Sequence, residues 1–179
     1  MSFKKIFLIF AILFILSESF YFRQVQAYRG ANLYDSGRQA ARRGDYDFAF
    51  MYFQEFLRRK PQSKSAQDAF FSLGEYYFKI KDYADSSKIF IRFIRQHPQS
   101  KAKIFALAYL LEISRLREDS FAVTAFEKEI AISKQLNLLF SDCKKSFYKS
   151  ALMEDYKALF YIDKIQIYIN GELFTQVSY

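Results

Sequence analysis

Residues that commonly carry catalytic or metal-binding chemistry are sparse in this sequence, and they do not form a recognisable set. His97 is the single histidine and stands beside Pro98 at the predicted end of a helix, where it can interact with the helix dipole. There is no P-loop, no G-x-S-x-G, no H-E-x-x-H and no paired cysteine pattern, and the acidic residues single out no acid–base pair. We therefore predict no enzymatic activity, no cofactor and no metal site.

Two further features have a chemical interpretation that we do not favour. Cys143 is the only cysteine, so no intrachain disulfide can form, and lone thiols are usually buried fillers. The run FLRRK at 56–60 places basic residues beside an aromatic one, a combination that can stack on RNA bases. Its aromatic residue falls on a predicted apolar helix face, which indicates a core role. We expect no nucleic-acid partner.

Bulk composition indicates one folded, mainly helical domain. The chain has 179 residues, of which 51% are apolar and 26% charged, enough for a core and too little charge for disorder. Only 5 Gly and 2 Pro leave little turn chemistry for an all-β fold. The net charge of +8 suits an acidic partner or an anionic surface.

Residues 1–27 resemble an export signal. Lys4 and Lys5 precede an unbroken apolar run from Ile6 to Leu16, and small residues allow cleavage after Ala27. The alternative is an uncleaved N-terminal membrane anchor, although the run is shorter than the ~20 residues that a membrane span needs. Both interpretations predict export. No cysteine follows the run closely, so a lipid modification of the bacterial lipoprotein type is not expected.

An internal repeat gives the chain its organisation. The four residues PQSK at 61–64 return at 98–101, 37 residues later. A fixed spacing of this size is typical of stacked structural repeats. The same shift aligns other residues with structural roles: Gly37 with Gly74, Phe53 with Phe90, and the turn GDY at 44–46 with KDY at 81–83.

Each copy is predicted to form two helices. In the second helix of each copy, apolar and small residues follow the helical i, i+3, i+4, i+7 spacing from Ala49 and from Ser86. Asp45 and Asp82 precede these helices as candidate N-caps, and Gly44 can take the left-handed conformation that ends the first helix. The seam between two copies then falls at PQSK.

These features resemble the tetratricopeptide repeat (TPR) family. Gly37 and Gly74 lie inside the first helices, where a missing side chain lets the partner helix approach closely. Together with the G-D-Y or K-D-Y turn and the closing proline, they resemble bacterial envelope TPR proteins of the BamD-like and CpoB (YbgF)-like type. The resemblance covers residues 30–135 and implies about three units. These are 30–66, 67–103 and a weaker 104–135, in which Asp119 keeps the cap position.

The C-terminal part is expected to differ from the repeats. Residues 136–163 are predicted to be a helical segment that caps the solenoid. Ile165, Ile167 and Ile169 then alternate with polar residues, and Asn170-Gly171 is a strong hairpin turn signal. We predict a β-hairpin with strands 164–169 and 172–178. Because an isolated hairpin is marginally stable, it either packs on the helices or pairs with a partner strand.

The predicted fold is an all-α, TPR-like helix–turn–helix solenoid with a short C-terminal β-hairpin. The resemblance implies a non-catalytic scaffold or adaptor in the bacterial cell envelope, possessing a concave groove for a protein or peptide segment and acting in outer-membrane or envelope assembly. The alternative is a structural subunit that pairs its hairpin with a partner sheet. Membrane contact is expected only through an uncleaved N-terminal segment. The family's groove positions fall on Tyr34, Arg38, Arg42, Phe71, Glu75, Phe78 and Lys79, with Glu112 and Arg115 in the third unit.

Overall fold

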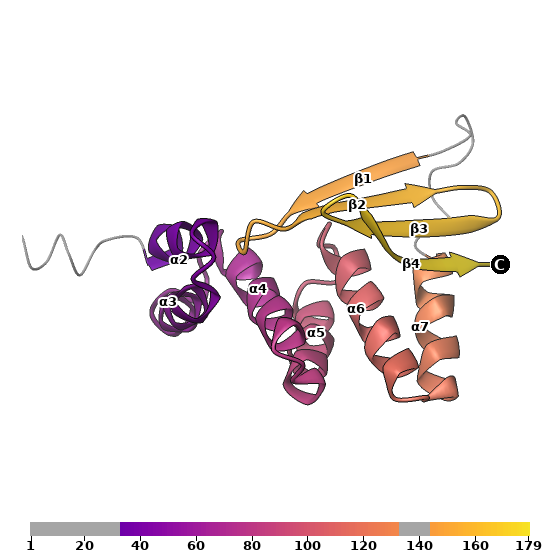
Figure 1. Ribbon diagram of the computed structural model, residues 1–179, viewed down its shortest axis with the longest axis horizontal. Helices are drawn as coiled ribbons and strands as arrows, with labels where there is room; N and C mark the ends of the chain where they lie inside the picture. Colours follow the sequence, from indigo (N-terminus) through magenta and orange to yellow (C-terminus); the bar gives the residue numbers. More distant parts are fainter. Residues whose placement is uncertain (1–32, 133–143) are drawn as a thin grey trace, which may run out of the picture.

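The computed structural model describes residues 33–132 and 144–179 (Figure 1). The predicted signal or anchor at 1–27 lies outside these residues, as does the stretch 136–143 at the start of the predicted capping segment. Within the described ranges, six α-helices are followed by four β-strands.

The helices form three antiparallel pairs that stack along the chain, as the TPR resemblance predicts (Figure 1). The first pair is α2 and α3, the second α4 and α5, and the third α6 and α7. Their bounds are α2 Leu33–Arg42, α3 Tyr46–Arg59, α4 Ala66–Lys79, α5 Tyr83–Gln96, α6 Lys103–Leu116 and α7 Ser120–Ile132.

The turn inside each pair repeats in its backbone. A left-handed residue ends the first helix at Gly44, Lys81 and Glu118, with φ of 80°, 63° and 57°. The next residue is an aspartate each time. The side chain of Asp82 accepts a hydrogen bond from the Asp85 amide at 3.1 Å, which confirms this predicted cap. Asp45 holds the same position, but its side chain forms no capping hydrogen bond.

The two helical glycines mark close contacts between paired helices. A Cβ added at Gly37 would lie 2.5 Å from the Phe53 ring, and one at Gly74 would lie 2.7 Å from the Phe90 ring. Both distances are shorter than carbon–carbon contact allows, so a side chain at either position would force the helices apart. The close approach predicted from the sequence is confirmed.

The C-terminal part forms an antiparallel sheet in the order β1-β2-β3-β4. The predicted hairpin is confirmed in β3 (Lys164–Ile169) and β4 (Glu172–Ser178), with positive φ at both Asn170 and Gly171. The helix predicted over 136–163 is wrong in its described part. That part contains β1 (Lys144–Lys149) and β2 (Asp155–Phe160) instead.

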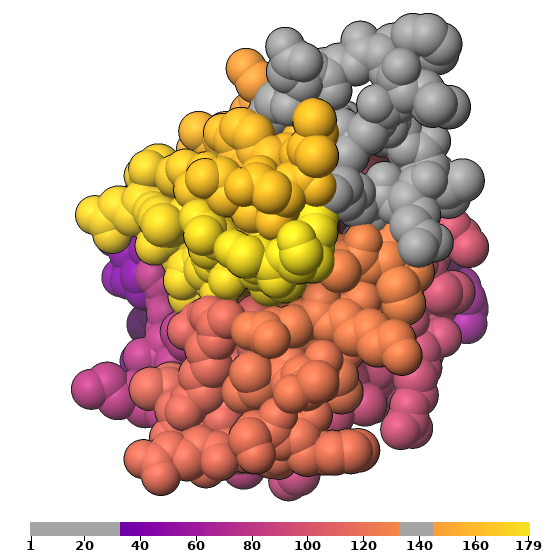
Figure 2. Space-filling model, turned by 90° about the vertical axis from the view of Figure 1, so that its right-hand side faces the viewer, coloured from indigo at the N-terminus to yellow at the C-terminus, as the bar shows by residue number. Residues whose placement is uncertain are grey.

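The sheet packs on α4, the first helix of the second unit, and on both helices of the third unit, α6 and α7. Its inner face buries Tyr156, Ala158, Ile165, Ile167 and Val177, each at most 3% exposed. In Figure 2, the yellow strands lie directly on the coral helices α6 and α7. The hairpin therefore packs against its own chain, and the sheet and the helices share one core.

Candidate functional site

The groove predicted from the TPR resemblance is covered by the sheet along its second unit. Phe71 of α4 is fully buried, with its ring 5.3 Å from that of Tyr148 in β1 and 5.6 Å from that of Tyr156 in β2. Phe78 packs against Tyr109 of α6 and Phe174 of β4, at centroid distances of 4.8 and 5.9 Å. These predicted groove residues therefore contact the protein's own C-terminal part.

Glu75 is the polar centre of this buried contact. Its carboxylate accepts hydrogen bonds from the Tyr156 hydroxyl at 2.5 Å and from the Ser72 hydroxyl at 2.8 Å. The Tyr156 hydroxyl also lies 2.7 Å from that of Tyr109. Burial raises the pKa of Glu75 to about 7, although the hydrogen bonds from Tyr156, Ser150 and Ser72 act to lower it. A carboxyl group that titrates near neutral pH thus connects the helices to the sheet.

Two more predicted groove residues hold the edges of the sheet. The Lys79 ammonium lies 2.6 Å from the Glu154 carboxylate in the β1–β2 turn and 4.2 Å from the centroid of the Tyr46 ring. In the third unit, Arg115 donates to Glu112 at 2.7 Å and to the Thr175 hydroxyl of β4 at 2.7 Å. Lys79, which was predicted to receive a partner's carboxylate, and Arg115, a predicted groove position, are both engaged within the chain.

The first unit remains open. Arg38 and Arg42 stand one turn apart on α2 and line a cavity of about 530 Å³, which we call the α2 cavity. It lies between α2 and the β1–β2 turn. Its lining residues are Arg38, Ala41, Arg42, Tyr46, Lys149, Leu152, Met153, Glu154 and Asn170.

The α2 cavity is electropositive. Within residues 33–132 and 144–179, no carboxylate forms an ion pair with Arg38 or Arg42, and the Arg38 Nε is buried without a hydrogen-bond partner. Glu154, the acidic residue of the lining, already accepts from Lys79 and from the Asn170 side-chain amide. Two guanidinium groups are therefore available to an incoming anion, and Arg can bind a carboxylate with two parallel hydrogen bonds.

Tyr34, another predicted groove residue of α2, does not line the cavity and instead connects α2 to α4. Its hydroxyl donates to Asp68 of α4 at 3.5 Å, and Tyr148 of β1 donates to the other oxygen of the same carboxylate at 3.1 Å. Burial, followed by the nearby Asp68 charge, raises the pKa of Tyr34 to about 12. The Arg38 guanidinium lies 5.9 Å from the centre of the ring of Tyr34, which stands one turn earlier on the same helix.

Sequence reasoning identified two of the nine residues that line this cavity. It selected Arg38 and Arg42 from the repeat, but it missed Lys149, Leu152 and Met153. These residues belong to the stretch that was predicted to be helical, so their place opposite α2 had no sequence signal.

The described residues contain no group of three or more His, Cys, Asp or Glu side chains arranged to hold a metal ion. No helix in the described ranges is long and apolar enough to cross a membrane.

A comparison with protein families adds an independent finding. The family model described as YfiO, outer membrane lipoprotein, matches residues 26–162, well over half of the 179-residue chain. The matched range includes all three helix pairs and the strands β1 and β2. No curated protein matches the chain at a significant level.

Proposed function

The chain belongs to the YfiO family of outer membrane lipoproteins, and from this premise we propose that it is a non-catalytic scaffold that binds a segment of a partner protein in the α2 cavity. The family is BamD-like, so the protein is an exported component of the cell envelope with protein partners there. We propose that the protein acts in the assembly of outer-membrane or other envelope proteins.

The observation that carries the proposal is the difference between the three units. The sheet covers the groove face of α4 and α6, whereas the α2 face keeps a cavity lined by Arg38 and Arg42, which pair with no carboxylate of the described residues. Guanidinium groups that are held beside a cavity and lack an internal partner favour a bound anion. A scaffold of this kind therefore receives its partner at one end of the solenoid.

The lining also indicates the kind of segment that fits. The partly exposed Met153 supplies apolar surface, and methionine adapts readily to differently shaped side chains. We expect a short segment that places a carboxylate on Arg38 and Arg42 and an apolar side chain beside Met153. A volume of about 530 Å³ accommodates a few side chains and excludes a whole folded domain.

The alternative of a subunit that offers its hairpin to a partner sheet receives less support. Strand β3 is paired on both sides, with β2 and with β4. The outer side of β4 faces the helices, and the Gln176 carbonyl there accepts a hydrogen bond from Arg115 at 3.4 Å. Neither hairpin strand presents a clear free edge.

Charge reversal at the cavity tests the proposal. The full chain carrying Arg38→Glu and Arg42→Glu is compared with the wild type in affinity capture from envelope extract of the cells that make it, read by mass spectrometry. The matched control is Arg95→Glu with Arg117→Glu, since both arginines are exposed and away from the cavity and the net charge changes equally.

We expect the cavity variant to lose its specific partner by at least about tenfold, because two charge-assisted contacts become repulsive, while the control variant retains it. Circular dichroism confirms that both variants are folded. Equal capture by the wild type and the cavity variant would reject the α2 cavity as the binding surface.

A further inference from the structure

The sheet has a second surface that the proposed function does not use, the outer edge of β1. In the order β1-β2-β3-β4, the strands β1 and β4 lie at the two edges. Strand β4 contacts α6 and α7, and Arg115 reaches its backbone. Within the described residues, β1 pairs with β2 alone, and Figure 1 shows it at the border of the molecule, on the side of the sheet away from β4.

The pairing register shows which backbone groups face this edge. Directly opposite residues in an antiparallel pair alternate between exchanging hydrogen bonds and pointing their backbone groups outwards. Just beyond the strands, the Ser150 amide donates to the Glu154 carbonyl at 3.0 Å, which fixes the phase of the β1–β2 ladder. Counting back in steps of two, Tyr148 bonds to β2, whereas Phe147 and Lys149 direct their N–H and C=O groups outwards.

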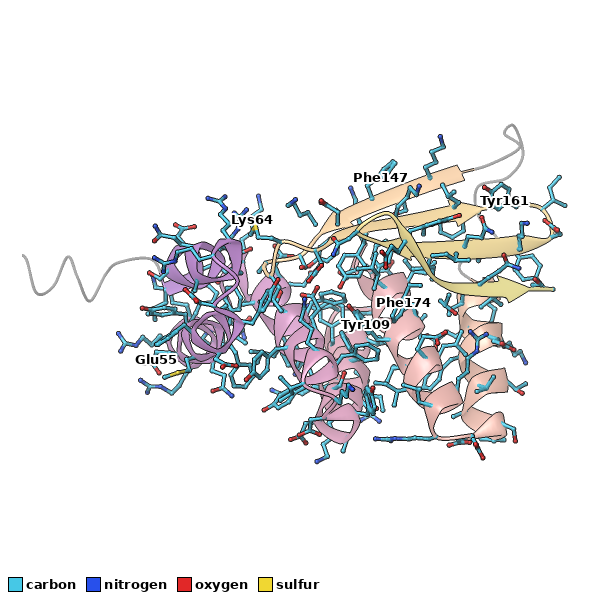
Figure 3. The ribbon with its side chains drawn as sticks, in the orientation of Figure 1. Glu55, Lys64, Tyr109, Phe147, Tyr161 and Phe174 are labelled. Carbon is cyan, nitrogen blue, oxygen red and sulfur yellow. The ribbon has the colours of Figure 1, made fainter. Side chains whose placement is uncertain are left out.

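The same alternation determines the side chains along the edge. Lys145, Phe147 and Lys149 all lie on the outer face of the sheet, and the Phe147 side chain is 64% exposed (Figure 3). Behind Phe147 stands its cross-strand partner Lys157, whose ammonium lies 4.4 Å from the Tyr168 ring centre. The outer face at this edge therefore presents the Phe147 ring between Lys145 and Lys149, with Lys157 on the neighbouring strand.

One carboxylate lies near this group, and it is only loosely engaged. Asp155 approaches the Lys149 ammonium at 2.9 Å, but the two side chains are 67% and 53% exposed. Such surface pairs contribute little stability and exchange readily for another carboxylate. A shallow cavity of about 400 Å³, lined in part by Phe147, Lys149 and Lys157, opens beside the edge.

The charges discriminate between the possible occupants. If a second copy paired antiparallel with β1 about Phe147, Lys145 of each copy would lie opposite Lys149 of the other, and like charges that face each other across strands are destabilising. Lysines on an edge strand commonly prevent pairing of this kind. The same side chains favour a strand with carboxylates at those two positions, and an aromatic residue between them can pair with the Phe147 ring.

We propose that the free edge of β1 is a strand-addition site for an extended acidic segment of a partner protein, in which an aromatic residue lies between two carboxylates at alternate positions. Backbone hydrogen bonds to Lys145, Phe147 and Lys149 supply the docking, and the side chains supply the selectivity. The proposal goes beyond the α2 cavity, because it uses the backbone groups along the outer edge of β1. Lys149 is the residue that the two surfaces share.

A synthetic peptide tests it. The probe is acetyl-Thr-Glu-Thr-Phe-Thr-Glu-Thr-amide, titrated into the isotope-labelled full chain and followed by amide chemical shifts and hydrogen exchange. Two control peptides accompany it: one has the same side chains with methylated amides at Glu, Phe and Glu, and the other has Lys in place of both Glu. The protein variants are Lys145→Glu with Lys149→Glu, and the matched control Lys101→Glu with Lys128→Glu, which are exposed lysines elsewhere.

We expect the acidic peptide to shift and protect the amides of Lys145, Phe147 and Lys149, and the methylated peptide to leave them unprotected. The edge variant should bind the acidic peptide about tenfold more weakly and instead bind the lysine peptide, which also proves that it is folded. The control variant should behave as the wild type.

Several outcomes would overturn the proposal. Equal binding of the methylated and unmethylated peptides would mean charge attraction without strand addition. An absence of response at the β1 amides at saturating peptide would exclude the site. Concentration-dependent self-association that protects the same amides would assign the edge to a second copy of the chain.

Discussion

The buried carboxyl group of Glu75 makes the attachment of the sheet to the helices depend on pH. In the folded protein, burial raises its pKa from the ordinary value of 4.5 to about 7. The folded state therefore holds the Glu75 proton more tightly than the unfolded state. The stabilisation is fully present below pH 4.5 and is lost as the pH rises through about 7.

The magnitude follows from the width of that interval. From 4.5 to about 7 there are about 2.5 pH units, and each unit corresponds to about 1.4 kcal/mol of free energy. Complete ionisation of Glu75 should thus lower the free energy of unfolding by about 3.5 kcal/mol, a large share of the stability of a domain of this size. Hydrogen bonds from Tyr156 and Ser72 persist to the ionised group, so complete unfolding is not expected.

The substitution Glu75→Gln isolates this effect. Glutamine has the same shape as the protonated acid and still accepts from Tyr156, but it does not titrate. Urea unfolding of both proteins, followed by circular dichroism at pH 5, 6, 7 and 8, gives the difference in their free energies of unfolding. All other titrating groups are common to both chains and cancel in this difference.

We expect the wild type to lose about 2.5 kcal/mol relative to Glu75→Gln between pH 5 and pH 8, because a small part of the effect is already lost at pH 5. The exposed Glu172→Gln serves as the control and should show a difference that does not change with pH. A flat difference for Glu75→Gln would refute the reasoning, since it would mean that the hydrogen bonds of the site fully offset the cost of burying the charge.

Three further substitutions test the packing around this contact. Gly74→Ala should destabilise the protein by about 1–3 kcal/mol in urea unfolding, because the new Cβ would meet the Phe90 ring; a gain in stability, as helix propensity alone predicts, would contradict the close packing. Tyr156→Phe should cost about 1–3 kcal/mol by removing a donor from a buried carboxyl, and more at pH 8 than at pH 5. Arg115→Met should change the free energy of unfolding by less than about 1 kcal/mol. It should nevertheless speed hydrogen exchange of the β4 amides, because it removes the hydrogen bond to Thr175. Unchanged exchange would mean that apolar packing alone holds β4 on the helices.

The repeat architecture was predictable because its signals are local. The turn positions Gly44, Lys81 and Glu118 recur every 37 residues, and each has a left-handed backbone, although glycine occupies only the first. The clash that a side chain would cause at Gly74 likewise follows from spacing within one helix pair. The hairpin was predictable for the same reason, because Asn-Gly determines its own turn.

Strands β1 and β2 were not predictable in this way. Leu152, Tyr156, Leu159 and Phe160 follow i, i+4, i+7, i+8, which favours a helix when the stretch is considered alone. In the structure, this stretch contains strand β2, which pairs with β1 on one side and with β3 on the other. Tyr156 and Phe160 both point to its buried face, since alternate residues of a strand share one face. Pairing with both neighbours outweighs the local pattern, and sequence periodicity carries no information about it.

The sequence did not indicate that the sheet fills the predicted groove positions of α4 and α6, and one repeat position explains why. Arg38, Glu75 and Glu112 are equivalent residues 37 apart on the first helices of the three units. Glu75 is buried under β2 and Glu112 pairs with Arg115, which binds β4, so the sheet has turned both positions into internal contacts. Arg38 is not covered by a strand, and among the described residues its Nε has no hydrogen-bond partner. On the function that we propose, partner recognition therefore falls on the first unit, whose groove position the sheet does not fill.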